Sequence, residues 1–193
     1  IKFNHTINNI FINEDKLVVF GSSYENNVPI RMQEKVMGMI APDYYSGKSH
    51  VNVYVYDISN REKIRMEYNL SVDGNYDDAR MIGEDVYLIS NEYVRNEIPV
   101  LNYRVNGMEK AVPIDDVYYT DIYDNSYTFT SILSLNVKNG EEQRKVYLTG
   151  GSGEVYVSEN NIYLTYAKRM SSLENANLFL LSSTKSFLPE SFS

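Results

Sequence analysis

Several residue types that define common functional sites are missing or rare in this chain of 193 residues. Cysteine is absent, which excludes disulfides, a thiol nucleophile and cysteine-based zinc sites. His5 and His50 are the only histidines, and no GxSxG motif offers a nucleophilic serine. The apolar runs are a handful of residues long, far short of the roughly 18 that span a bilayer. The sequence therefore disfavours thiol, serine and zinc-dependent catalysis, and it contains no candidate membrane span.

Positive charge is also in short supply. The chain has 18 lysines and arginines against 26 acidic residues, which gives a net charge of −8. Binding to nucleic acid needs clustered positive charge, so we expect no nucleic-acid partner. Hydrophobic residues make up 43% of the chain, as in ordinary globular proteins. The composition predicts a folded domain with an acidic, well-solvated surface.

A repeated pattern organises the chain. Residues 73–93 read DGNYDDARMIGEDVYLISNEY, and weaker copies occur at residues 5–22 and 151–168. The copies align at a turn that carries a glutamate in each: Glu14, Glu84 and Glu159. A repeat with a long period is typical of proteins built from successive copies of one structural unit.

Each repeat unit contains four strand-like segments. After the first two, one copy continues at residues 51–58 and 65–72, and the next at 132–137 and 143–149. Valine, isoleucine, tyrosine and threonine fill these segments, and asparagine, aspartate and glycine separate them. The middle segments are apolar on both faces, as in strands covered by a sheet on each side. This pattern predicts an all-β fold, a β-propeller segment of four-stranded antiparallel blades, with a β-sandwich as the alternative.

The same residues carry a family resemblance. The motifs VYVYDISNREK at residues 53–63, ARMIGEDVYLISNEY at 79–93 and GGSGEVYVSENNIYLTY at 150–166 resemble a family of secreted archaeal and bacterial β-propeller proteins. The resemblance covers residues 7–166 and implies a distant relation to WD repeats and an extracellular or cell-surface location. The family is described by its fold, so the resemblance implies no catalytic residue. The absence of tryptophan argues against the Asp-box repeat of sialidase-like propellers.

The repeat divides the chain, which we interpret as a single domain, into two full units and an incomplete one. These units lie at residues 5–73, 74–150 and 151–193. About two and a half blades cannot close a ring, and a closed ring is what removes open sheet edges. We therefore expect either a fragment of a larger propeller or copies that self-associate through open blade faces.

Three long insertions follow the second strand of each unit, at residues 22–49, 91–126 and 167–193. Equivalent loops of successive blades emerge on the same face, so one face should be decorated and the other closed by short turns. Binding residues concentrate in loops on a rigid scaffold, so the insertions are candidates for a binding site. The alternative is that the insertions cap the ring or plug its channel. In the third insertion, a capping-box pattern at residues 171–174 predicts a short helix near the C-terminus.

Two sets of polar side chains are candidates for a binding site on this face. Asp77 and Asp78 begin the innermost strand of the second unit, with Arg80 two residues further on, where they could contact a polar ligand near a channel axis. The second set lies in the second insertion: Tyr118, Tyr119 and Asp121. Tyrosine offers a large contact area at modest entropic cost. The alternatives are an aspartate pair that ends a turn beside a paired arginine, and an insertion packed onto its own blade.

A cluster of aspartates in the second insertion supplies the candidate metal ligands: Asp115, Asp116, Asp121 and Asp124. Calcium prefers several oxygen ligands, but these residues do not match the spacing of a calcium-binding loop, and no glycine forces its sharp turn. We therefore expect no cofactor, with calcium as the exception that this cluster would allow.

These patterns favour a non-catalytic binding or scaffolding module of a secreted or cell-surface protein. Its partner would be a protein or a glycan on the decorated face. The first alternative is a hydrolase that acts on glycans through channel carboxylates, which would require a perturbed carboxylate among Asp77, Asp78 and Glu154. The second alternative is a purely structural domain that oligomerises.

Overall fold

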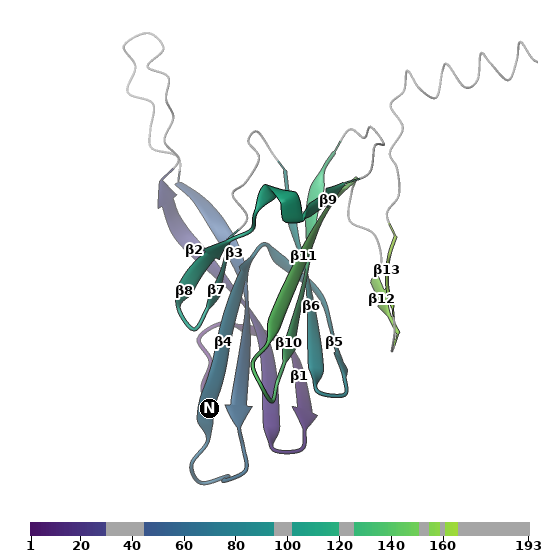
Figure 1. Cartoon of the computed structure of the whole chain (residues 1–193). Coiled ribbons are helices and arrows are strands. Elements are labelled where there is room, and N and C mark those ends of the chain that lie inside the picture. Colours follow the sequence, from purple (N-terminus) through teal and green to yellow (C-terminus); the bar gives the residue numbers. More distant parts are fainter. Residues whose placement is uncertain (30–44, 95–101, 120–125, 151–154, 159–160, 166–193) are drawn as a thin grey trace, which may run out of the picture.

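The computed structural model of the chain describes residues 1–29, 45–94, 102–119, 126–150, 155–158 and 161–165 (Figure 1). Within these residues, thirteen strands form three sheets. None of the described segments is a helix long and apolar enough to cross a membrane. The helix predicted near the C-terminus lies outside the described residues.

Blade 1 is a meander of four antiparallel strands, and each pairs with the next along the chain. They are β1 (Thr6–Asn13), β2 (Lys16–Pro29), β3 (Tyr45–Asp57) and β4 (Arg65–Asp73). The turn between β1 and β2 is tight, and Glu14 adopts the left-handed conformation there with φ of 53°. Along β3, Val51, Val53 and Val55 are buried and alternate with partly exposed residues, whereas β2 buries Val18, Val19 and Phe20 in succession and is therefore apolar on both faces.

Blade 2 repeats this arrangement with β5 (Asn75–Ile82), β6 (Asp85–Tyr93), β10 (Thr128–Asn136) and β11 (Glu142–Thr149). A third sheet contains β12 (Val155–Val157) and β13 (Ile162–Leu164). The four strands of each full unit therefore occur in the predicted order, and the sheets are consistent with a partial β-propeller. The all-β fold predicted from the repeat is confirmed.

The second insertion adds strands that the sequence did not predict. The hairpin of β7 (Asn102–Val105) and β8 (Met108–Ala111) pairs with β4, so the sheet of blade 1 has six strands. A 3₁₀ turn at Ile114–Asp116 leads into β9 (Val117–Tyr119), which pairs in parallel with β11, so the sheet of blade 2 has five strands. The alternative of an insertion packed onto its own blade is therefore right for β9 and wrong for β7 and β8.

The core lies between the two blades. Val18 and Phe20 of β2 and Val53 of β3 belong to one buried cluster with Leu88 and Leu133 of blade 2. Successive residues of a strand point to opposite faces, so Asn52, Tyr54 and Tyr56 of β3 lie on the face of blade 1 turned away from blade 2. On that face, Phe3 and His5 contact the Tyr54 ring at centroid distances of 5.8 Å and 5.4 Å.

The two ends of the blades differ. The links β1–β2, β3–β4, β5–β6 and β10–β11 are short turns at one end, here called the turn end (Figure 1). The links between β2 and β3 and between β6 and β10 are long and leave from the opposite end, here called the insertion end. The chain also crosses from blade 1 to blade 2 at the insertion end, where Gly74 donates a backbone hydrogen bond to Ser49.

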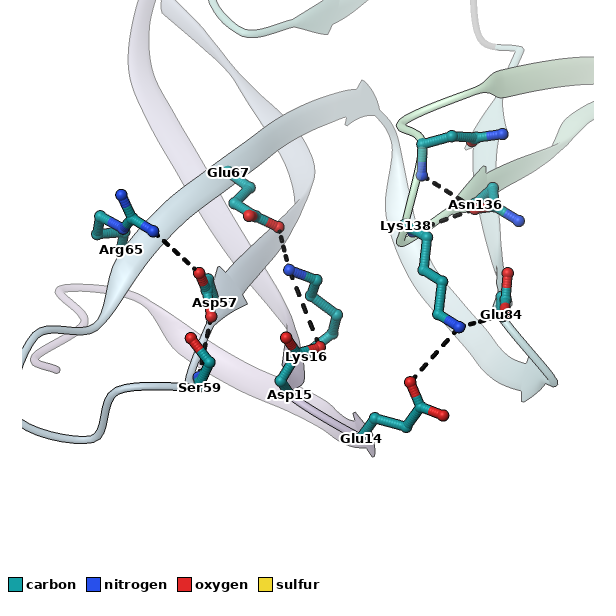
Figure 2. Close-up of polar contacts among 11 residues, drawn as sticks. Glu14, Asp15, Lys16, Asp57, Ser59, Arg65, Glu67, Glu84, Asn136 and Lys138 are labelled. Carbon is teal, nitrogen blue, oxygen red and sulfur yellow. Dashed lines mark hydrogen bonds and ion pairs between the residues drawn. The ribbon is translucent and has the colours of Figure 1, made fainter.

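Ion pairs at the turn end connect the blades (Figure 2). Lys138, which follows β10, lies 2.5 Å from Glu84 of its own blade and 3.4 Å from Glu14 of blade 1. These glutamates are the positions at which the repeat copies align. Within blade 1, hydrogen bonds from Ser59 and Arg65 lower the pKa of Asp57 to about 2. The turn end is therefore occupied by structural contacts.

Candidate functional site

The candidate residues on β5 form a local pair. The Asp78 carboxylate accepts hydrogen bonds from Arg80 at 2.7 Å and from the Ala79 backbone amide at 2.8 Å. Asp77 is exposed to solvent, and the register of β5 against β6 shifts beside it. Desolvation by neighbouring groups and the charge of Asp78 raise the pKa of Asp77. A hydrogen bond from Asn91 lowers the pKa but does not cancel the increase. This geometry matches the paired aspartate and arginine given as the alternative to a ligand site.

The candidate residues of the second insertion lie on β9 and the turn before it. Tyr118 stacks on Tyr147 at 5.4 Å, whereas Tyr119 is 75% exposed. Asp115 and Asp116 are exposed. Asp121 and Asp124 lie outside the described residues, as does Glu154. The part of the chain that the structure describes contains no group of three side chains that could hold a metal ion.

The two candidate sets do not form one site. In the sheet of blade 2 the strand order is β5, β6, β10, β11 and β9, so the two sets occupy opposite edges. At a strand spacing of about 4.8 Å, the edges are roughly 19 Å apart. A shared binding role for Asp77, Asp78, Arg80, Tyr118 and Tyr119 would need a ligand large enough to cross the whole blade, and each set separately stays a prediction.

The sequence interpretation missed a buried polar cluster at the insertion end. Asp73, at the end of β4, accepts a hydrogen bond from His50 Nδ1 at 2.9 Å and one from Lys48 Nζ at 2.5 Å. The other ring nitrogen of His50 lies 3.4 Å from the Glu25 carboxylate. Burial opposes ionisation of Asp73, but the bonds from His50 and Lys48 outweigh it and hold the pKa below its usual value. Asp73 therefore fixes two side chains of the neighbouring strand.

The cluster continues across the boundary between the blades. Burial raises the pKa of the Glu92 carboxyl of β6 and lowers the pKa of the Arg144 guanidinium of β11 to about 10. Arg144 donates to Ser131 Oγ at 2.8 Å and lies 5.2 Å from the Tyr103 ring of β7. Among the described residues, Glu92 Oε2 and Arg144 Nε are buried without a hydrogen-bond partner. This part of the cluster faces the neighbouring blade.

Two adjacent grooves open at the insertion end. The inner groove, about 410 Å³, lies at the start of β1 and β5 and is lined by Asn4, His5, Thr6, Ser22, Ser23, Tyr24, Ser49, Gly74 and Asn75. The side groove, about 430 Å³, crosses β2, β3, β4 and β7 and is lined by Ser23, Glu25, His50, Asn52, Asn69, Ser71, Arg104 and Gly107. The grooves share Ser23.

The chemistry of these grooves is suited to binding. Among the described residues, Glu25 is the only carboxylate that lines either groove, so these residues offer no carboxylate pair of the kind that glycoside hydrolysis uses. Amide, hydroxyl and imidazole groups predominate, and they can accept and donate hydrogen bonds to a polar ligand. One signal in the sequence could have revealed the site: Lys48, His50 and Asn52 alternate across the boundary between the first insertion, placed at residues 22–49, and the strand predicted at residues 51–58.

Two packed antiparallel blades, extended by insertion strands and followed by the start of a third, define a β-propeller segment. In agreement, residues 1–186 match the family described as "Beta propeller domain", and the chain belongs to this family. An uncharacterised protein of Archaeoglobus fulgidus is 27% identical over 118 residues, which cover 59% of this chain and 19% of that protein.

An uncharacterised protein of Methanocaldococcus jannaschii is 24% identical over 139 residues, which cover 69% of this chain and 21% of that protein. The matched part of the chain thus spans about a fifth of each curated relative. No solved structure matches the chain significantly. The family predicted from the motifs is confirmed, whereas secretion and a relation to WD repeats stay predictions.

Proposed function

We propose that this chain is a non-catalytic binding module that takes its ligand at the insertion end of the blades. The observation that carries the proposal is the pair of adjacent grooves that meet at Ser23. Their walls come from five strands of one sheet and from the first residues of blade 2, so the site is built on rigid elements. Asp73 holds His50 and Lys48 in place beside the side groove.

The kind of partner follows from the lining and from the charge of the chain. Both grooves are polar, which favours a hydrogen-bonding ligand such as a glycan or a polar segment of a protein. The net charge of −8 disfavours nucleic acid. A secreted or cell-surface setting is part of this proposal and is supported by the resemblance of the motifs to secreted propeller proteins.

A thermal-shift and surface-capture screen against calcium, glycans and cell-surface proteins would test this proposal. A ligand that binds only the folded state stabilises it by about 2.7 kcal/mol at a hundredfold excess over Kd. We expect Ser23→Arg to abolish capture by filling the shared wall of both grooves. Glu62→Arg, an exposed position at the turn end, should leave capture unchanged. Capture that survives Ser23→Arg would contradict a site at the insertion end.

The experiment also separates the alternatives. A structural domain that oligomerises would give no ligand in the screen, and sedimentation would show assembly that grows with protein concentration. A hydrolase would release product from a glycan, and that release would respond to changes at Asp77 or Glu92. Deletion of residues 91–126 is a poor test, because it removes β7, β8 and β9 together with their pairing to both blades.

A further inference from the structure

The geometry points to a binding site for an uncharged saccharide in the inner groove. This inference rests on the proposed function and specifies the ligand class of one of its two grooves. The inner groove spans both blades, since Gly74 and Asn75 of blade 2 complete a wall that begins with residues of β1, β2 and β3.

The described lining of the inner groove is polar and carries no acidic or strongly basic side chain. Among the described residues, no lysine, arginine, aspartate or glutamate lines the inner groove. Hydroxyl and amide side chains form most of its wall: Asn4, Thr6, Ser22, Ser23, Ser49 and Asn75. Such groups offer donors and acceptors in comparable numbers without a net charge, which matches the vicinal hydroxyls of a neutral sugar. A charged ligand would lose hydration here without gaining an opposite charge.

An exposed aromatic ring, Tyr24, also lines the inner groove. Tyr24 is 60% exposed, yet its ring lies against the backbone of Gly47 on the neighbouring strand. A Cβ at position 47 would collide with the ring where it now lies, so a side chain there would displace the ring. An exposed aromatic ring of this kind gives a stacking surface. The apolar face of a pyranose fits such a surface.

The wall formed by His5 is built in the same way. The His5 imidazole lies over Gly21, where an added Cβ would meet it, and stacks on Tyr54 at 5.4 Å. Two glycines of adjacent strands thus each place one ring of the groove. The side groove is different in kind, because Glu25 and Arg104 line it and would favour a charged or zwitterionic ligand. The saccharide site is therefore assigned to the inner groove alone.

The test is calorimetric titration of the whole chain with defined probes. The neutral probes are cellotetraose, maltotetraose, mannotetraose and chitotetraose. The charged probe is tetragalacturonate, and a neutral Ser/Gly/Asn peptide represents a protein ligand. Three variants examine the ring: Tyr24→Ala removes it, Tyr24→Phe keeps the stacking surface, and Gly47→Ala displaces it. Tyr119→Ala removes an exposed ring on β9 and is the matched control.

We expect at least one neutral tetrasaccharide to bind, with affinity about tenfold weaker in Tyr24→Ala and Gly47→Ala. That loss corresponds to the energy of one aromatic contact. Tyr24→Phe and Tyr119→Ala should bind within about twofold of the unchanged chain, since an aromatic contact at the groove is retained in both. Unfolding temperatures measured for each variant keep a folding defect from being mistaken for a binding defect.

Three results would overturn the assignment. One is no heat of binding from any neutral tetrasaccharide at millimolar concentration, and the second is preference for tetragalacturonate or the peptide. The third is saccharide binding that Tyr24→Ala and Gly47→Ala leave unchanged. In the last two cases the Ser23→Arg variant tests the wider proposal of a ligand site at the insertion end. If Ser23→Arg abolishes binding, the ligand binds at the insertion end. If binding survives Ser23→Arg, both the saccharide site and the site at the insertion end are contradicted.

Discussion

At the scale of single residues, Asp73 is a buried carboxylate that depends on two side-chain hydrogen-bond donors. It is 4% exposed and accepts hydrogen bonds from both His50 and Lys48. A buried carboxylate in this setting is stabilised only while its partners remain, and the partners in turn lose their acceptor if it is removed. The residue that follows is Gly74, whose φ of 110° and close approach to the Asn91 carbonyl leave no room for a side chain.

We predict that Asp73→Asn lowers the free energy of unfolding by about 2–3 kcal/mol, because a neutral amide replaces the acceptor of two charge-assisted hydrogen bonds. Urea unfolding measured at neutral pH checks this value. Asp78→Asn is the matched control, since it removes a carboxylate paired with a half-exposed arginine, and should cost less than about 1 kcal/mol. Equal losses in the two variants would mean that burial of Asp73 contributes nothing.

Two carboxyl groups at the insertion end give stability opposite dependences on pH. The pKa of Asp73 is lowered from 3.8, so its contribution is present above that pH and is lost as the pH falls below it. The pKa of Glu92 is raised from 4.5 by burial, with Lys48, Asp73, Arg144 and His50 around it. The folded state therefore binds the Glu92 proton more tightly, and acidification towards pH 4.5 increases stability.

We predict that Glu92→Gln removes this gain on acidification, because glutamine is neutral at every pH. The free energy of unfolding in urea, measured from pH 4.5 to 7.5, should rise towards the acidic end in the unchanged chain and stay flatter in the variant. Glu62→Gln deletes one negative charge at an exposed position and controls for net charge. A slope that Glu92→Gln leaves intact would assign the effect to another group.

At the scale of elements, the hairpin β7–β8 is the feature that joins the blades at their outer edge. Its β7 strand pairs with β4 of blade 1, whereas its Tyr103 ring lies over Arg144 of blade 2. The contact matters because Arg144 is largely buried and has nitrogen atoms without partners among the described residues. Besides the hydrogen bond to Ser131, the Tyr103 ring face and the charges of Asp73 and Glu92 favour this guanidinium.

We predict that Tyr103→Ala lowers the free energy of unfolding by about 2 kcal/mol, through the lost ring–guanidinium contact and the lost packing of the ring against the main core cluster. Tyr119→Ala removes a ring of the same size that is 75% exposed, and should change stability by less than about 0.5 kcal/mol. Thermal and urea unfolding of both variants give the comparison. A loss confined to Tyr119→Ala would show that β9, and not the hairpin, ties the insertion to the blades.

The strands of the blades could be predicted because their signals are local. The runs around Val18, Val53 and Leu88 are apolar on both faces, and turn residues bound them on each side. The alignment at Glu14 and Glu84 fixed the order of strands within each unit. The structure confirms the strands and their order. Val18, Val53 and Leu88 lie in the core between the blades, and Glu14 and Glu84 form the ion pairs at the turn end.

The candidate site could be predicted only in part, because it depends on contacts between distant segments. His50 and Asp73 come from separate strands, and nothing in the sequence near either residue indicates that they form a hydrogen bond. The pairing of β7 with β4 depends on β4 being the free edge strand of blade 1. The sequence of residues 102–105 contains no signal of that free edge. In the sequence Tyr24 is one of 18 tyrosines, and only its position over Gly47 in the structure distinguishes it from the others.

At the scale of the whole molecule, the two large sheets share one core and should unfold together. The main cluster takes buried side chains from β2, β3 and β4 of blade 1 and from β5, β6 and β10 of blade 2. Neither sheet has a second cluster of that size among the described residues. If one blade unfolded alone, the face of the other blade that it covers would be exposed to water. Partial unfolding would therefore lose the free energy of burying the whole interface between the blades.

We predict that Leu88→Ala, which truncates a buried side chain in this shared core, lowers the free energy of unfolding by about 2–5 kcal/mol. Met108→Ala on the exposed strand β8 is the control and should stay within about 0.5 kcal/mol. Urea unfolding should be followed by far-ultraviolet circular dichroism and by tyrosine fluorescence. We expect both signals to shift together in one transition, because the lost contacts belong to both blades. Two transitions, of which only one responds to Leu88→Ala, would mean that the blades fold independently and that the interface contributes little to either.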